Sequence, residues 1–167
     1  MDLTLDHLLN TTYEELSMNK VKRFNITDLT RASNVARGTI YYYFESIEDI
    51  YMATFKKYIL NIAIEKSDTF NKFVFNFISQ INENKIFSLN VYHLAALNFR
   101  KVVLLDIFNG QLTKYKAKYN KNDNYLVSGL CFIVIYWLDH NLELETELII
   151  QEINHYLGLL QITFEQI

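Results

Sequence analysis

The feature that most restricts the fold of this chain is the absence of proline from all 167 residues, together with only four glycines. Proline and glycine are the residues that most often interrupt helices and form tight turns. Their scarcity favours long helices over architectures built from strands and turns. Every segment with periodic apolar residues repeats at helical spacing, and no stretch shows convincing strand alternation. The sequence therefore predicts an all-α protein.

The composition is that of a globular chain, long enough for one small domain joined to one of medium size. Half of the residues are hydrophobic and 21% are charged. The longest apolar run, 125–138, is shorter than the roughly 18 residues that a membrane-spanning helix needs. The acidic N-terminus does not resemble a signal peptide, and the single cysteine, Cys131, lies in an apolar run where a buried thiol is expected. We therefore expect a cytoplasmic protein without a membrane partner.

Charge is distributed unevenly along the chain. Residues 18–44 carry five cations and one anion, a net charge of +4, although the whole chain has a net charge of −3. The rest of the chain therefore has a net charge of −7. A basic N-terminal segment on an acidic body suggests contact with a polyanion, although a solvated basic face explains the charge equally well.

Three helices are predicted within residues 1–46. The first presents one apolar face, made by Leu5, Leu8, Leu9, Tyr13 and Leu16. Asn25 and Asp28 have the spacing of a capping box at the start of a second short helix. Its inner stripe is Ile26, Leu29 and Ala32. Asn34 tolerates the left-handed conformation of a tight turn, and a third helix is predicted from about Arg37 to Tyr43.

A fourth, longer helix is expected to connect this N-terminal domain to a second domain, 47–167. Ser46 and Asp49 form a second capping pair at its start. Its apolar stripe contains Ile47, Ile50, Tyr51, Thr54, Phe55, Tyr58, Ile59 and Ile62. Further helices are predicted at about 68–84, 88–107, 110–119, 124–140 and 145–164.

Residues 25–44 have the layout of a helix-turn-helix, the motif that places its second helix in the major groove of DNA. Lys22, Arg23 and Thr27 would lie along the DNA backbone, because cationic side chains, hydroxyls and helix-end amides bind phosphate. Arg37 can pair with guanine through two hydrogen bonds. Gly38 permits close approach of the helix, and Thr39 offers a hydroxyl and a methyl group.

Three consecutive tyrosines complete the predicted reading helix. Successive helical residues point in different directions, so they cannot all face one surface. We expect Tyr42 to face the bases, and Tyr41 and Tyr43 to face the flanking phosphates. Ile40 and Phe44 should point inward and seal the three-helix core.

The segment "ITDLTRASNVARGTIYYYFESIEDIY" resembles the DNA-binding signature of the TetR/AcrR family of transcriptional regulators. The matching positions are Ile26, Leu29, Val35, Gly38, Thr39, Tyr41, Phe44, Ser46, Glu48 and Ile50. The resemblance covers about a third of the chain, residues 4–60. Four positions depart from the family pattern: Asn34, Ala36, Tyr43 and Ile47. Ala36 removes a helix cap and a phosphate ligand, and Ile47 removes a phosphate ligand, so weaker non-specific DNA binding than the family norm is expected.

The resemblance implies a homodimeric repressor that binds a palindromic operator in double-stranded DNA. It also implies a C-terminal domain that dimerises and often binds an effector, either a small molecule or a protein. The helices 124–140 and 145–164 are apolar around most of their surface and suit a four-helix dimer interface, or alternatively an internal core. Candidate effector-binding residues lie between the connector helix and the next two helices: Phe73, Phe77, Tyr92, His93 and Phe99. Each of them fits equally a plain core position.

No pattern of catalytic or metal-binding residues is recognisable. The four histidines lack metal-ligand spacing, and no phosphate-binding or nucleophile motif is present. We therefore expect no enzyme activity, no cofactor and no metal. The alternative hypothesis is a helical protein-interaction module or co-regulator, including an activator, that keeps a TetR-like fold with weakened DNA binding.

Overall fold

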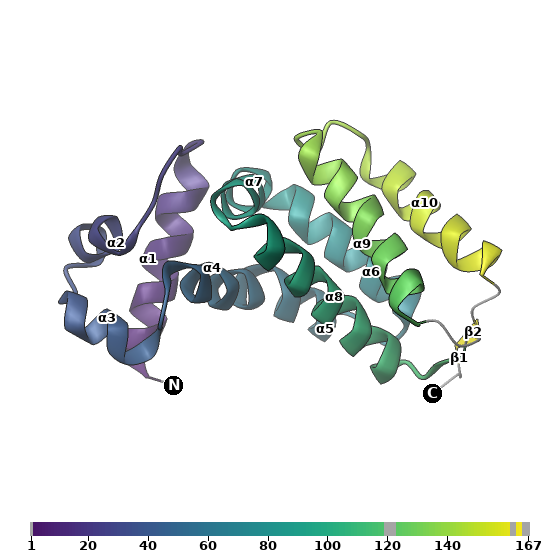
Figure 1. Cartoon of the computed structure of the whole chain (residues 1–167), viewed down its shortest axis with the longest axis horizontal. Helices are drawn as coiled ribbons and strands as arrows, with labels where there is room; N and C mark the ends of the chain where they lie inside the picture. Colours follow the sequence, from purple (N-terminus) through teal and green to yellow (C-terminus); the bar gives the residue numbers. More distant parts are fainter. Residues whose placement is uncertain (1, 119–122, 161–162, 165–167) are drawn as a thin grey trace.

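Helices α1 to α3 cluster at one end of the molecule and the remaining helices form a larger body at the other end (Figure 1). The computed structural model describes residues 2–118, 123–160 and 163–164. The helices are α1 (Leu3–Met18), α2 (Ile26–Ser33), α3 (Arg37–Tyr43), α4 (Ile47–Phe55), α5 (Asn61–Glu65), α6 (Phe70–Glu83), α7 (Lys85–Leu94), α8 (Leu97–Lys114), α9 (Asp123–Asp139) and α10 (Thr146–Leu159). A π-helical turn, η1 (Lys56–Leu60), joins α4 to α5. The predicted all-α class is confirmed.

The boundaries of α2 follow the local signals in the sequence. The Asn25 side chain accepts hydrogen bonds from the N–H groups of Thr27 and Asp28, and the Asp28 carboxylate accepts one from the Asn25 N–H at 3.0 Å. Asn34 ends the helix in the left-handed conformation with φ of 56°. The prediction that Ala32 faces inward was wrong. Ala32 is exposed, and Ser33 takes the inner position with its hydroxyl bonded to the carbonyl of Leu29.

The connector is one continuous helical rod from α4 through η1 to α5. Ser46 and Asp49 form the predicted capping box at its start. The π-helical turn was not predicted. Within it, the consecutive residues Lys57 and Tyr58 both reach α1, where each donates to the side-chain oxygen of Asn10, at 2.5 Å and 2.6 Å. The connector is therefore fastened to the first helix as well as to the body.

Two predicted helix boundaries in the body were wrong. Instead of helices at 88–107 and 110–119, the chain forms α7 and α8 with a break at Ala95 and Ala96, and Gly110 lies inside α8. Tertiary contacts make the break, because Arg100 Nε donates to the Ala95 carbonyl at 2.8 Å and the Ala96 N–H donates to Glu48 at 3.3 Å. The break falls at two adjacent alanines, which give no local signal for a helix end.

A short strand pair also departs from the prediction. Strand β1 (Ala117–Lys118) pairs antiparallel with β2 (Thr163–Phe164), in the register Ala117 to Phe164. The helix predicted at 145–164 therefore ends earlier, with α10 at Leu159, and residues 161–162 lie outside the described part of the chain. The pair joins the end of α8 to the segment after α10 (Figure 1).

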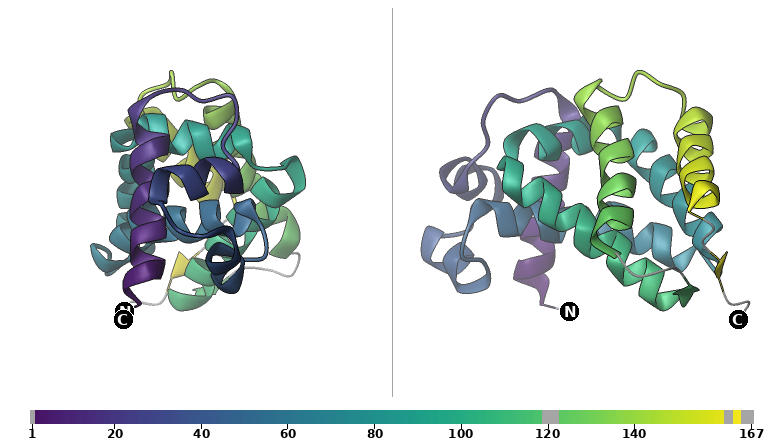
Figure 2. Two further views of the ribbon diagram at one scale, coloured as in Figure 1. Left: turned by 90° about the vertical axis from the view of Figure 1, so that its left-hand side faces the viewer. Right: turned by 45° about the vertical axis from the view of Figure 1, so that its right-hand side comes forward.

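The core of the body is rich in aromatic residues. It is continuous with the apolar core of the N-terminal cluster, α1 to α3. Phe73, Phe77 and Phe108 are fully buried, and the rings of Phe73 and Phe77 stack with their centroids 5.4 Å apart. Trp137 is also fully buried, and its indole N–H donates to the Leu144 carbonyl. Figure 2 shows α1 lying against the body, on the side that carries α7. Among the described residues, no helix is long and apolar enough to cross a membrane.

Candidate nucleic-acid interface

Helix α3 presents its polar and aromatic side chains to solvent. Ile40 is completely buried and anchors the helix on the N-terminal cluster, whereas Arg37, Gly38 and Tyr42 are exposed, Tyr42 to 81%. Because an exposed tyrosine leaves its ring in water at a free-energy cost, such a surface is typical of a contact site. In Figure 1 the helix lies at the outer edge of the molecule, away from the body.

Arg37 and Tyr41 act as a pair on the exposed face of α3. A guanidinium N–H of Arg37 donates to the Tyr41 hydroxyl at 3.0 Å, and the guanidinium carbon lies 5.4 Å from the ring centroid. Both residues line a shallow hollow of about 300 Å³ between α2, α3 and the start of α4, together with Thr27. The structure therefore brings three of the candidate DNA-binding residues to one concave surface.

Tyr43, at the C-terminal end of α3, is held by the residue that precedes α1. Its hydroxyl donates to the carboxylate of Asp2 at 2.5 Å, and the same carboxylate caps the start of α1. This hydrogen bond lowers the pKa of Asp2 and raises the pKa of Tyr43. Asp2 was not among the predicted site residues, because no motif signals that the two ends of the domain meet. The bond orients the C-terminal end of α3 on α1.

The remaining candidates lie around α3. Lys22 and Arg23 are exposed in the segment between α1 and α2, and neither forms an ion pair with a described residue. Ala36 is exposed and precedes α3 in extended conformation without a side-chain cap, as the sequence predicted. Thr39 is half-buried. Because they form no ion pair with a described residue, Lys22 and Arg23 keep their positive charge available for an anionic partner.

Helices α9 and α10 expose apolar side chains despite their contribution to the core. Phe132 and Tyr136, one helical turn apart on α9, are 65% and 46% exposed. On α10, Leu148 and Leu159 are 47% and 68% exposed, whereas Ile149, Ile153 and Leu157 are buried. Each helix thus packs one face into the internal core and exposes apolar side chains on another face.

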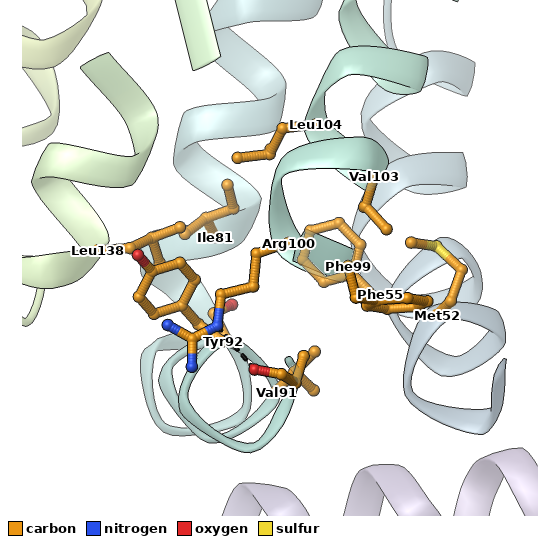
Figure 3. A pocket seen from close by; sticks show the side chains of 12 residues that line it. Met52, Phe55, Ile81, Val91, Tyr92, Phe99, Arg100, Val103, Leu104 and Leu138 are labelled. Atoms are coloured by element: carbon orange, nitrogen blue, oxygen red, sulfur yellow. Dashed lines mark hydrogen bonds between the residues drawn. The ribbon is translucent and has the colours of Figure 1, made fainter. Parts of the chain in front are cut away.

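A small cavity of about 60 Å³ lies between α4, α7 and α8 (Figure 3). Two of the candidate effector-binding residues, Tyr92 and Phe99, line it. Phe73 and Phe77 are instead packed into the core, and His93 is exposed. Arg100 also lines the cavity, although the sequence patterns did not identify it. Burial and a hydrogen bond to Asp139 raise the pKa of Tyr92 to about 12, so its hydroxyl is protonated at neutral pH.

Among the residues that the structure describes, no group of three or more His, Cys, Asp or Glu side chains gathers in a way that could hold a metal ion.

Comparison with solved structures identifies the fold. The chain superposes on the dihydroxyacetone kinase operon activator DhaS with a TM-score of 0.61 at 16% identity, covering 98% of this chain and 99% of that one. It superposes on a TetR transcriptional regulator from Rhodococcus sp. RHA1 with a TM-score of 0.59 at 15% identity, covering 94% of each chain. No family model matches the sequence, and no curated protein matches it. The chain therefore has the fold of the TetR-type transcriptional regulators.

Proposed function

We propose that this protein is a homodimeric, sequence-specific DNA-binding transcriptional regulator of the TetR type, acting as a repressor in the cytoplasm. The observation that carries the proposal is the exposed face of α3, with Arg37, Tyr41 and Tyr42 in solvent, on a fold of this type. The N-terminal residues of such a helix enter the major groove, where arginine reads guanine.

We also propose that the protein dimerises through α9 and α10, as the reading of a palindromic operator requires. Two α3 helices related by a two-fold axis would reach successive major grooves, roughly 34 Å apart, and read a palindromic operator. The exposed Phe132, Tyr136 and Leu148 supply an apolar surface on these helices that a second copy would cover. Under this proposal residues 1–46 read DNA, and residues 47–167 dimerise and bind an effector in the cavity.

DNA binding can be tested by a mobility-shift assay with the region upstream of the protein's own gene. A retarded complex that forms with this DNA and resists excess unrelated DNA supports the proposal. Binding should weaken steeply as salt increases, because Lys22, Arg23 and Thr27 contact phosphates in this scheme. An affinity independent of salt would contradict those contacts. Light scattering on the free protein should give twice the mass of one 19.8 kDa chain.

A second candidate function is a protein-interaction module of the same fold with weakened DNA binding. It is favoured by the missing cap at Ala36 and by Ile47, a half-buried residue where the family pattern has a lysine. The two functions differ in the same assay. A dimer that retards no specific DNA fragment at low salt would favour the interaction module.

A further inference from the structure

We infer that the cavity between α4, α7 and α8 binds an amphipathic carboxylate, with its carboxylate at Arg100 and Ser88 and its apolar tail along α8. The inference deepens the proposed effector control and rests on it for the biological role. The binding itself is a separate property, which can be measured without DNA.

One of the polar side chains that line the cavity is a buried donor without an acceptor among the described residues. Ser88 is 3% exposed, and its hydroxyl oxygen has no hydrogen-bond partner within the described part of the chain. A buried polar atom without a partner costs about 1–3 kcal/mol, which a ligand acceptor would recover. The Tyr92 hydroxyl is already used, because it donates to Asp139 at 2.6 Å.

Arg100 supplies a positive charge to a cavity whose other walls are almost entirely apolar. Its guanidinium lies over the Tyr92 ring, 4.4 Å from the centroid, and donates to the carbonyls of Ala95 and His93. Those bonds use two of its five N–H groups. No carboxylate among the described residues, Asp139 included, lies within ion-pair distance of it. In the described part of the structure, a cation without an ion pair and a hydroxyl donor without an acceptor line the same cavity, and both suit a small anionic acceptor such as a carboxylate.

The proposed path of the tail leads from the cavity to a second hollow, which shares three lining residues with it. Met52, Phe99 and Val103 line both the cavity and a groove of about 520 Å³ between the connector and α8. Figure 3 shows these three side chains beside one another, on the side of the cavity away from Tyr92. The groove extends along α8 to Gly110. The helix from Phe99 to Gly110 is about 16 Å long, which suits a medium-length alkyl chain.

Calorimetric titration of the full-length protein with sodium dodecanoate, below its micelle concentration, tests the inference. Dodecyltrimethylammonium has the same tail and the opposite charge, and serves as the matched probe. Dodecanoate should bind at least about tenfold more tightly than the cation, because a hydrogen bond to a charged group contributes about 1.5–3 kcal/mol. Equal binding of both amphiphiles, or no binding of dodecanoate, would overturn the inference.

Two variants locate the charge in the cavity. Arg100→Gln should weaken dodecanoate binding about ten- to a hundredfold, whereas Lys101→Gln, an exposed cation one residue along α8, should change it less than about twofold. If Arg100→Gln does not fold, Ser88→Ala provides the same test and should weaken binding about two- to tenfold. Equal effects of Arg100→Gln and Lys101→Gln would refute the site.

A further variant tests the groove. A β-carbon built on Gly110 meets no atom within 4 Å, so Gly110→Phe introduces a bulky side chain at the groove that Gly110 lines. It should weaken binding of dodecanoate and leave binding of hexanoate, which is too short to reach Gly110, unchanged. Equal losses for both would contradict the tail path. Dodecanoate that binds through Arg100 but leaves the mobility shift unchanged would support the site and refute its effector role.

Discussion

The side-chain oxygen of Asn90 accepts a hydrogen bond from the backbone N–H of Val21 at 3.0 Å, across 69 residues of sequence. Its amide nitrogen donates to the carbonyls of Leu16 and Asn19, each at 2.8 Å. Asn90 is 2% exposed. One buried amide on α7 therefore binds three backbone groups at the end of α1 and in the segment after it. Because neighbouring Val91 and Tyr92 line the cavity, α7 joins that cavity to the end of α1 and to the segment that precedes α2.

Removing the Asn90 amide should destabilise the protein. In Asn90→Ala the N–H of Val21 and the carbonyls of Leu16 and Asn19 lose their partner in a buried place, so the free energy of unfolding should fall by about 1–3 kcal/mol. Urea denaturation followed by circular dichroism measures it. Asn71→Ala, at an exposed position of α6, is the matched control and should stay within about 0.5 kcal/mol. Equal effects of the two substitutions would show that the three bonds do not stabilise the fold.

The elements that the sequence predicted correctly are those determined by nearby residues. Asn25 and Asp28 cap α2, and Ser46 and Asp49 cap α4, within four residues of chain. The apolar period of the connector is likewise visible locally. The exposure of Arg37 and Tyr42 on α3 also followed from the motif, because its inward position, Ile40, leaves the polar neighbours outside.

The features that the sequence did not reveal depend on contacts between distant residues. Glu48 on α4 stabilises the break between α7 and α8 from 48 residues away, and the two alanines at the break would otherwise continue a helix. Asp2 meets Tyr43 across 41 residues. The cavity depends on how α4, α6, α7, α8 and α9 pack, so Tyr92 and Phe99 were identified as candidates while Arg100 was not.

Substitution of Arg37 should weaken and broaden DNA recognition under the proposed function. Arg37→Ala removes the guanidinium that reads a guanine, so operator affinity should fall by about 1–3 kcal/mol and discrimination at one base pair should be lost. Arg31→Ala removes the same charge from α2, where the side chain pairs with Asp28, and should keep the sequence preference. Mobility shifts on single-base operator variants measure both. An unchanged preference in Arg37→Ala would exclude Arg37 from base reading.

The same glycine-to-alanine change should have opposite effects at two helical sites. At Gly110 a β-carbon meets no atom within 4 Å, so Gly110→Ala should stabilise α8 by about 0.5–1 kcal/mol. At Gly129 on α9 it would lie 2.1 Å from the Tyr156 hydroxyl oxygen, so Gly129→Ala must displace that ring and should cost about 1–3 kcal/mol. Thermal unfolding of both variants measures the difference. Stabilisation by both would mean that α10 moves freely away from α9.

Because the Cys131 thiol is buried, the free energy of unfolding should fall in alkaline solution. Burial raises the pKa of Cys131 to about 12, from the ordinary value of 9.0, because the thiolate is poorly solvated there. Below pH 9 both folded and unfolded chains hold the proton, so the free energy of unfolding does not depend on this group. Between about 9 and 12 only the unfolded chain releases it, and the free energy of unfolding should fall as pH rises.

Urea denaturation in steps through that range measures the slope for the wild type and for Cys131→Ala. The variant should start less stable, because it leaves a small cavity, but should lose less stability between pH 9 and pH 10, where the tyrosines titrate equally in the two proteins. In the folded wild type the same burial should make the thiol react far more slowly with a thiol reagent than it does in urea. Identical slopes in the two proteins, or equal reaction rates with and without urea, would show that the thiol reaches solvent in the folded state.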